Sequence, residues 1–214
     1  MKYILYIFLF TISLGFAQDK LPFADEVLEI QKKYNNQLDS SRETIVFTGS
    51  SSIRMWHDLS KKFPKHQIVN SGFGGSKAYD LLIHHKELIL DFKPKKVFIY
   101  EGDNDISGKV KSKVILENIL KIIQKIQEKD ATTEIVLISV KPSISRWKLR
   151  GKYKRLNRKF KALAKTNATI SFIDVWNPML KGRKLDKDLF ISDGLHMNYR
   201  GYDIWYSAIK PFMQ

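Results

Sequence analysis

Short apolar runs alternate with longer helical patterns along the chain. The runs are rich in Val, Ile and Phe and nearly continuous in apolar character, which is typical of parallel strands buried on both faces; they cover residues 44–48, 67–70, 96–100, 134–140 and 169–175. Apolar residues at helical spacing fill the intervals, over residues 23–34, 77–90, 111–129, 147–165 and 199–211. This alternation predicts one α/β domain, a three-layer sandwich in which helices cover both faces of a parallel sheet of about five strands.

The strand ends locate the candidate chemistry, because the sites of such sheets lie outside the carboxyl ends of their strands. Serines 50–52 follow the first run, and the glycine-rich segment 70–76 follows the second. Residues 101–105, with sequence EGDND, follow the third, and residues 192–196, SDGLH, lie beyond the fifth. Each piece alone is ordinary turn chemistry. Together they supply what acyl transfer needs: a serine, a histidine with a carboxylate, and hydrogen-bond donors for an oxyanion.

In these segments the chain resembles the SGNH hydrolases, also called GDSL-like lipases or acylhydrolases, from about residue 44 to the C-terminus. Within this family, the chain most resembles the platelet-activating-factor acetylhydrolase-like and carbohydrate-esterase members. The family's Gly-Asp-Ser block is GSS here, which places the nucleophile on Ser51. The second block places a glycine on Gly75, the Gly-x-Asn-Asp block an asparagine on Asn104, and the Asp-x-x-His block the pair Asp193 and His196. A flavodoxin-like sheet is the fold that this resemblance implies.

The resemblance also implies a mechanism. Ser51 attacks a carboxylic ester, His196 is the general base and then the general acid, and Asp193 orients the imidazole. The backbone N–H groups of Ser51 and Gly75 and the amide of Asn104 form the oxyanion hole. No cofactor or metal is implied. The family's aspartate before the nucleophile is Ser50 here, which is expected to support the turn, while Ser52 is expected to begin or cap the next helix.

Other readings are weaker. An α/β-hydrolase elbow, Gly-x-Ser-x-Gly, lacks its second glycine here, and no histidine pair has the spacing of a zinc enzyme. The segment 148–165 is rich in Lys and Arg and predicts either the solvated face of an amphipathic helix or a binding module for glycan or other anions. The formal charge of +15 permits anionic partners. An intact Ser/Gly/Asn/Asp/His set favours an enzyme.

Residues 1–17 are expected to be a cleaved signal peptide: Lys2 precedes an apolar run that is short for a membrane span, and Gly15 and Ala17 suit the cleavage site. Residues 18–214 then form the single domain. The sequence has no cysteine, which excludes disulfides and a lipidated cysteine. We therefore expect a periplasmic or secreted bacterial protein that neither binds nucleic acid nor stays inserted in a membrane after cleavage.

The substrate is less clearly indicated. A compact chain with few insertions suits removal of a small acyl group, such as acetyl, from a carbohydrate. Lysophospholipids and thioesters are the alternatives within the family. Trp56, Arg146 and Trp147 follow predicted strands and are the candidates for contact with the substrate, although core or rim packing is the safer interpretation of the two tryptophans.

Overall fold

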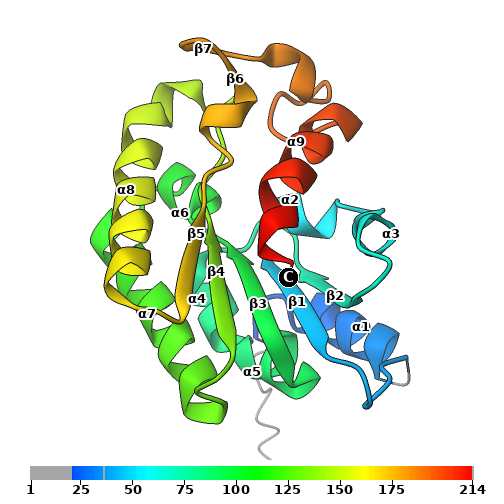
Figure 1. Cartoon of the computed structure of the whole chain (residues 1–214). Helices are drawn as coiled ribbons and strands as arrows, with labels where there is room; N and C mark the ends of the chain where they lie inside the picture. The colour runs from blue at the N-terminus through cyan, green and yellow to red at the C-terminus, as the bar shows by residue number, and fades with distance from the viewer. Residues whose placement is uncertain (1–20, 36, 214) are drawn as a thin grey trace, which may run out of the picture.

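The computed structural model describes residues 21–35 and 37–213, so the expected signal peptide lies outside the described residues. Five parallel strands form the main sheet in the order β2-β1-β3-β4-β5 (Figure 1). They are β1 Thr44–Gly49, β2 Gln67–Gly72, β3 Pro94–Tyr100, β4 Glu134–Ile138 and β5 Ile170–Ile173. β1 pairs on one side with β2, from Thr44 opposite Gln67 to Gly49 opposite Gly72, and on the other with β3. All five predicted strands are confirmed.

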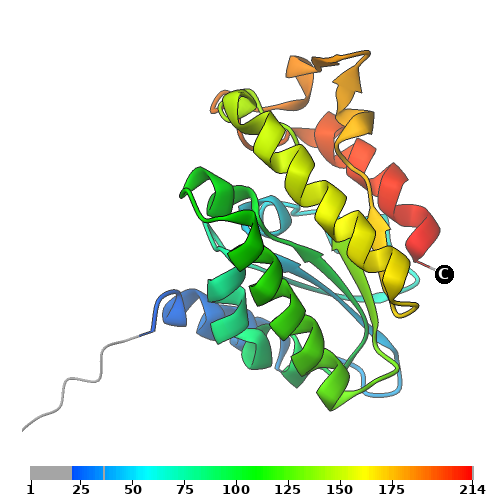
Figure 2. The ribbon, with the colours of Figure 1, turned by 90° about the vertical axis from the view of Figure 1, so that its left-hand side faces the viewer.

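Helices cover both faces of the sheet (Figures 1 and 2), which confirms the three-layer α/β sandwich. One face is covered by α1 Ala24–Tyr34, α4 Ala78–Ile83, α5 His85–Leu88, α7 Ser112–Lys129 and α8 Arg150–Thr166. The other is covered by α2 Ser51–Arg54, α3 Leu59–Lys62 and α9 Tyr199–Ile209. Alternate residues of a strand pack against the two helical layers: Val97 of β3 packs with the first group of helices and Phe98 with the second. This is the period-two alternation of a strand buried on both sides.

Several predicted elements have different bounds, and in two of them the structure shows the cause. The helix expected over residues 77–90 is divided into α4, α5 and the 3₁₀ turn η1 Leu90–Phe92. The backbone leaves the α region at His84, whose Nε2 lies 2.6 Å from the carbonyl oxygen of Pro22 ahead of α1. β4 ends at Ile138, two residues early, because the Asn157 side chain of α8 hydrogen bonds both backbone groups of Val140. Tertiary contacts therefore set both boundaries.

Short elements complete the fold. α6 Asp103–Ser107 follows β3, and η2 Trp147–Leu149 precedes α8. The strands β6 Leu180–Lys181 and β7 Lys184–Leu185 form an antiparallel hairpin at the top of Figure 1, between η3 Asn177–Met179 and η4 Lys187–Leu189. After α9, Pro211 lies in the last turn, η5 Lys210–Phe212, as expected because proline lacks the N–H that would continue a helix. No helix within the described residues is long and apolar enough to cross a membrane.

Candidate active site

Ser51 lies where β1 turns into α2. Gly49, the last residue of β1, has φ of +120°, and a Cβ there would lie 2.0 Å from the carbonyl oxygen of Tyr100, so this position requires glycine. The same Tyr100 oxygen accepts a hydrogen bond from the Ser50 N–H at 3.1 Å. Ser50 thus supports the turn through its backbone, and Ser51 is the first residue of α2. The expectation that Ser52 begins or caps this helix was wrong: Ser52 is its second residue and is buried.

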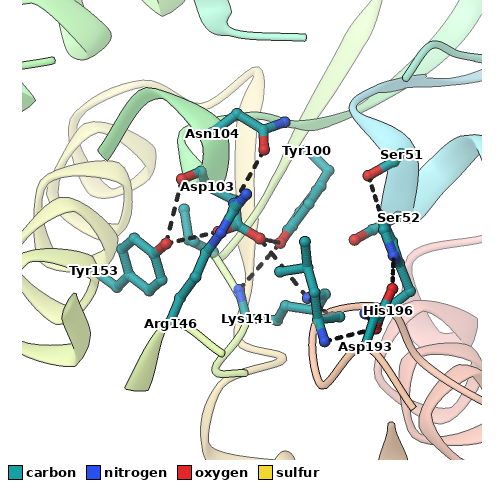
Figure 3. A network of polar contacts seen from close by, with 12 residues as sticks. Ser51, Ser52, Tyr100, Asp103, Asn104, Lys141, Arg146, Tyr153, Asp193 and His196 are labelled. Carbon is teal, nitrogen blue, oxygen red and sulfur yellow. Dashed lines mark hydrogen bonds and ion pairs between the residues drawn. The ribbon is translucent and has the colours of Figure 1, made fainter. Parts of the chain in front are cut away.

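The structure brings Ser51, His196 and Asp193 into one hydrogen-bonded chain (Figure 3). Ser51 Oγ lies 2.9 Å from His196 Nε2, and His196 Nδ1 lies 2.5 Å from Asp193 Oδ2. A carboxylate only accepts hydrogen bonds, so in the neutral ring Nδ1 carries the hydrogen and Nε2 accepts from the serine hydroxyl. The arrangement can therefore take a proton from Ser51 onto Nε2.

Asp193 is fixed by a tight turn before α9. Its Oδ1 accepts hydrogen bonds from the backbone N–H groups of Leu195 at 2.8 Å and His196 at 2.9 Å, and Gly194, which directly follows Asp193, has φ of +64°. Desolvation raises the pKa of Asp193, but the hydrogen bonds from the His196 ring and from these two N–H groups outweigh it and lower the pKa to about 2. The carboxylate is therefore ionised and able to stabilise an imidazolium.

The predicted oxyanion donors lie on the loops after β2 and β3. Gly75 is exposed, has φ of +76°, and faces open space where a Cβ would stand. Asn104, in the first turn of α6, is half-buried and donates from Nδ2 to the carbonyl oxygen of Ser76 at 2.9 Å. Figure 3 shows its amide nitrogen directed to the side of the site where Ser51 lies. An amide nitrogen has two hydrogens, so a second donor remains for a ligand.

Two buried carboxyl groups lie under these loops. The Ser76 hydroxyl donates to Glu101 Oε1 at 2.7 Å, and the Ala78 N–H lies 3.2 Å from both oxygens of Asp105. Burial, followed by the negative charge of Asp105, raises the pKa of Glu101 well above its usual range. Burial also raises the pKa of Asp105 to about 6, against the hydrogen bond from Ala78. The two carboxyls tie the loop after β2 to the segment after β3.

A second polar cluster lies beside Asn104, which we call the Asp103 network; it consists of Tyr100, Asp103, Lys141, Arg146 and Tyr153. The carboxylate of Asp103 is its centre and is almost fully buried. It accepts from Arg146 and from the Tyr153 hydroxyl, both at 2.7 Å, and Lys141 Nζ lies 3.7 Å from it. Sequence reasoning missed Asp103, Lys141 and Tyr153. The available signal was Lys141, a lysine directly after a buried strand run.

The three predicted substrate contacts have different surroundings. Trp56 is 1% exposed and packs against Tyr202 and Trp205 in the core, so almost none of its surface is available to a ligand; this placement corrects the expectation for Trp56. Trp147 is half-buried and stacks on Trp176 with ring centroids 6.1 Å apart. Arg146 lies at the site, where its guanidinium hydrogen bonds Asp103 and Asn104.

Within residues 21–35 and 37–213, no cluster of three or more His, Asp or Glu side chains is arranged to hold a metal ion. The basic residues of segment 148–165 lie mainly on the exposed side of α8, while Tyr153, Leu156 and Phe160 are buried against the sheet. The pattern of an amphipathic helix with a solvated face is therefore present. Binding of anions by this face stays a prediction.

Comparison with known proteins decides the family. The GDSL-like Lipase/Acylhydrolase family matches residues 41–204. The chain belongs to this family. Its segments after β1, β2, β3 and β5 are those in which the sequence resembles the family's blocks. As a member of the GDSL-like acylhydrolases, the protein is an ester-hydrolysing enzyme.

Individual proteins are also similar to this chain. A Streptococcus pneumonia protein named after platelet activating factor is 26% identical, with a TM-score of 0.77 over 89% of this chain and 94% of that one. A GDSL-like lipase from Bacteroides thetaiotaomicron is 24% identical, with a TM-score of 0.73 over 89% of this chain and 94% of that one. The N-acylneuraminate cytidylyltransferase of Escherichia coli is 31% identical over 184 residues, which are 84% of this chain and 42% of that protein. The chain thus spans less than half the length of that relative.

Proposed function

We propose that this acylhydrolase cleaves carboxylic esters through an acyl-enzyme on Ser51 and that it removes small acyl groups, such as acetyl, from a carbohydrate. One observation carries the proposal: the hydrogen-bonded chain from Ser51 Oγ through His196 to Asp193, at 2.9 Å and 2.5 Å. This geometry lets His196 Nε2 accept the serine proton as Oγ attacks the ester carbonyl. The ionised Asp193 then stabilises the imidazolium that forms.

In the proposed mechanism, the tetrahedral intermediate places its oxyanion toward the N–H groups of Ser51 and Gly75 and the amide of Asn104. His196 gives its proton to the leaving alcohol, and the acyl group stays on Ser51. A water molecule then attacks the acyl-enzyme while His196 again acts as the base, so that the carboxylic acid leaves and Ser51 regains its proton. A single donor of this kind contributes about 3–4 kcal/mol to lowering the barrier.

A small acyl group and a sugar are favoured by the surroundings of Ser51. Open space lies next to Gly75, and Asp193 is exposed, so the rim is open and polar there. A long acyl chain gains affinity by filling a buried apolar groove. The relative from Escherichia coli is named for a reaction of an acylated sugar acid, and the formal charge of +15 would attract such an anion.

Longer acyl esters, including lysophospholipids, are the second candidate, because two apolar side chains are exposed near the histidine. Ile191 and Ile144 are about two-fifths exposed. The N–H of Ile191 donates to the His196 carbonyl, and Ser145, next to Ile144, donates to the Gly194 carbonyl. Both side chains therefore belong to loops that hold the Asp193–His196 turn, where an acyl chain or leaving group could contact them.

Export is a further part of the proposal. Residues 1–17 carry the pattern of a signal peptide, and cleavage after Ala17 would release the domain into the periplasm or medium. The substrate is then an ester met outside the cytoplasm, and nucleic acid is not a partner. N-terminal sequencing of the protein from the exported fraction tests this: a start at Gln18 supports export, and a start at Met1 contradicts it.

The decisive experiment compares hydrolysis of p-nitrophenyl acetate and p-nitrophenyl octanoate by wild type and Ser51→Ala. Loss of turnover in a folded Ser51→Ala variant supports Ser51 as the nucleophile, and faster hydrolysis of the acetate supports the small-acyl proposal. Release of acetate from O-acetylated glycans then tests the carbohydrate. A preference for octanoate would favour lipid esters, and full activity of Ser51→Ala would remove Ser51 from the mechanism.

A further inference from the structure

The guanidinium of Arg146 joins the Asp103 network to the oxyanion candidate. One nitrogen, Nη1, lies 2.7 Å from Asp103 Oδ1 and 3.0 Å from Asn104 Oδ1 (Figure 3). We propose that the Asp103 network positions both halves of the active site: Arg146 sets the orientation of the Asn104 amide, and Lys141 holds the turn that carries His196. This inference rests on the proposed function, in which Asn104 and His196 act on the ester.

Arg146 fixes which end of the Asn104 amide faces the nucleophile. Arginine has five N–H donors and no acceptor, so only the amide oxygen can face its guanidinium. The amide nitrogen must then point the other way, where it donates to the Ser76 carbonyl at 2.9 Å and keeps one N–H free. Rotation of the amide by half a turn would oppose donor to donor at Arg146 and acceptor to acceptor at Ser76. The positive charge of the Arg146 guanidinium next to Oδ1 also polarises the amide and strengthens its free N–H as a donor.

Arg146 is itself held by a rigid, buried anion. The Asp103 side chain is 5% exposed, and its Oδ1 also accepts from the Tyr153 hydroxyl. Desolvation raises the pKa of Asp103, but Lys141 and Arg146 outweigh it and hold the pKa below its usual value. The pair is therefore ionised at neutral pH, and hydrogen bonds between charged groups are stronger and more directional than neutral ones.

Lys141 carries the second connection. Its side chain has no exposed surface, and its Nζ donates to the carbonyl oxygen of Leu195 at 2.6 Å. Leu195 lies between Gly194 and His196, in the turn whose N–H groups hold Asp193. The same Nζ lies 3.7 Å from Asp103 Oδ2. One buried carboxylate thus faces two cations, each of which contacts a different half of the site.

This geometry assigns Arg146 to positioning instead of substrate binding, although its side chain is 19% exposed. Nη1 already makes two hydrogen bonds, to Asp103 and to Asn104. A residue that binds substrate changes KM when it is removed, whereas one that orients an oxyanion donor changes kcat. The two roles therefore give different kinetics.

A double-mutant cycle tests the first connection, with Arg146→Ala, Asn104→Ala and the double variant. We expect Arg146→Ala to lower kcat by about 10- to 100-fold with KM within about twofold of wild type. In the Asn104→Ala background the same change should lower kcat less than about threefold, because the group through which Arg146 acts is gone. Arg150→Ala, an exposed neighbour that contacts Trp147, is the matched control and should resemble wild type. Equal losses in both backgrounds, or a rise in KM alone, would overturn the inference.

A measurement without turnover separates this inference from the proposed function. In ¹⁵N-labelled protein, Arg146→Ala should shift the side-chain amide signals of Asn104, and Arg150→Ala should leave them in place. Lys141→Met, which keeps the length of the side chain, should shift the Nδ1–H signal of His196, while Lys148→Met should not. Unmoved signals in folded Arg146→Ala and Lys141→Met variants would refute positioning, even if the enzyme proved inactive on every ester tested.

Discussion

Ser51 Oγ and His196 Nε2 lie within hydrogen-bonding distance although 145 residues separate them in the chain. The elements that follow them are joined directly, because the Tyr202 hydroxyl of α9 donates to the Ser52 carbonyl of α2 at 3.0 Å. Trp56 stacks on the ring of the same tyrosine. The serine and the histidine are thus held by one packed layer, and substitutions of single polar atoms near them will report on chemistry more than on folding.

Replacement of Asn104 by alanine removes the proposed side-chain donor to the oxyanion. We expect Asn104→Ala to lower kcat by about 100- to 1000-fold with little change in KM, because the lost bond strengthens only in the transition state. Steady-state kinetics with p-nitrophenyl acetate measure both constants. Asn177→Ala is the control: Asn177 is exposed, contacts Asp174 and lies in η3. Wild-type kcat in Asn104→Ala would exclude this residue from the mechanism.

Gly75 and Gly182 form a matched pair for the proposed backbone donor. Both have positive φ, +76° and +63°, and neither has an atom within 4 Å of an added Cβ. Alanine at either position should therefore lower the free energy of unfolding by a similar amount, about 1–2 kcal/mol, because a residue with a Cβ is strained in the left-handed region. Only Gly75→Ala should also lower kcat, because the strain displaces its N–H. Urea unfolding and kinetics measure the two effects, and equal kcat in both variants would argue against Gly75.

The fold could be predicted from the sequence because its signal is repeated and local. The five apolar runs and the helical spacing between them each predict the same α/β sandwich independently. The errors in the predicted bounds occur where a contact with a residue distant in the sequence sets the end of an element. His84, which contacts the Pro22 carbonyl, lies where the predicted helix over 77–90 divides. The helix α2 has four residues, too few for a periodic pattern to be visible.

The candidate site was predictable only in part. Ser51, Gly75, Asn104, Asp193 and His196 lie in family blocks. The first three follow strands closely, whereas Asp193 and His196 lie well beyond β5. Asp103 occupies the variable position of its block, and its partner Arg146 comes from the loop before α8. Side chains that come from separate loops to contact one buried carboxylate have no characteristic spacing in the sequence. The burial of Trp56 was equally invisible, since a tryptophan after a strand suits both a rim and a core.

The core position of Trp56 predicts a stability effect without an effect on binding. Trp56→Ala should lower the free energy of unfolding by about 3–5 kcal/mol, as expected for removal of a large buried aromatic side chain. Trp147→Ala should lower the free energy of unfolding by less, because Trp147 is half-buried and stacks on Trp176. Urea unfolding measures both losses. A raised KM in folded Trp56→Ala with unchanged stability would instead return Trp56 to the substrate site.

Asp193 predicts a stability difference that disappears in acid. Its pKa is lowered to about 2, because hydrogen bonds from His196 and Leu195 outweigh the desolvation that raises it. A carboxyl with a depressed pKa stabilises the fold above its unfolded pKa of about 4 and loses this effect as pH falls toward 2. The difference in Tm between wild type and Asp193→Asn should therefore shrink as pH falls below about 4. The backbone N–H groups of Leu195 and His196 are present in both proteins, so the variant differs from wild type only in the side chain at position 193. A difference that grows on acidification would contradict the assignment.

Asp105 predicts the opposite dependence on pH. Burial raises its pKa to about 6, so between about pH 4 and 6 the folded protein holds a proton that the unfolded chain has released. Stability must then fall as pH rises through this window, by about 2–3 kcal/mol from this group. Buried Glu101, whose pKa is also raised, acts in the same direction.

The variant Asp105→Asn isolates this effect, because an amide does not titrate. Urea unfolding at intervals from pH 4 to 7 should show the stability of Asp105→Asn rising relative to wild type as pH increases, with no further change above about pH 7. Any hydrogen bond from Ala78 that the amide loses adds an offset that does not vary with pH. Asp58→Asn, at an exposed carboxyl, should keep the wild-type slope. If Asp105→Asn and wild type ran parallel across the range, Asp105 would have to be ionised throughout, and the carboxyls beneath the Gly75 loop would carry charge at pH 5.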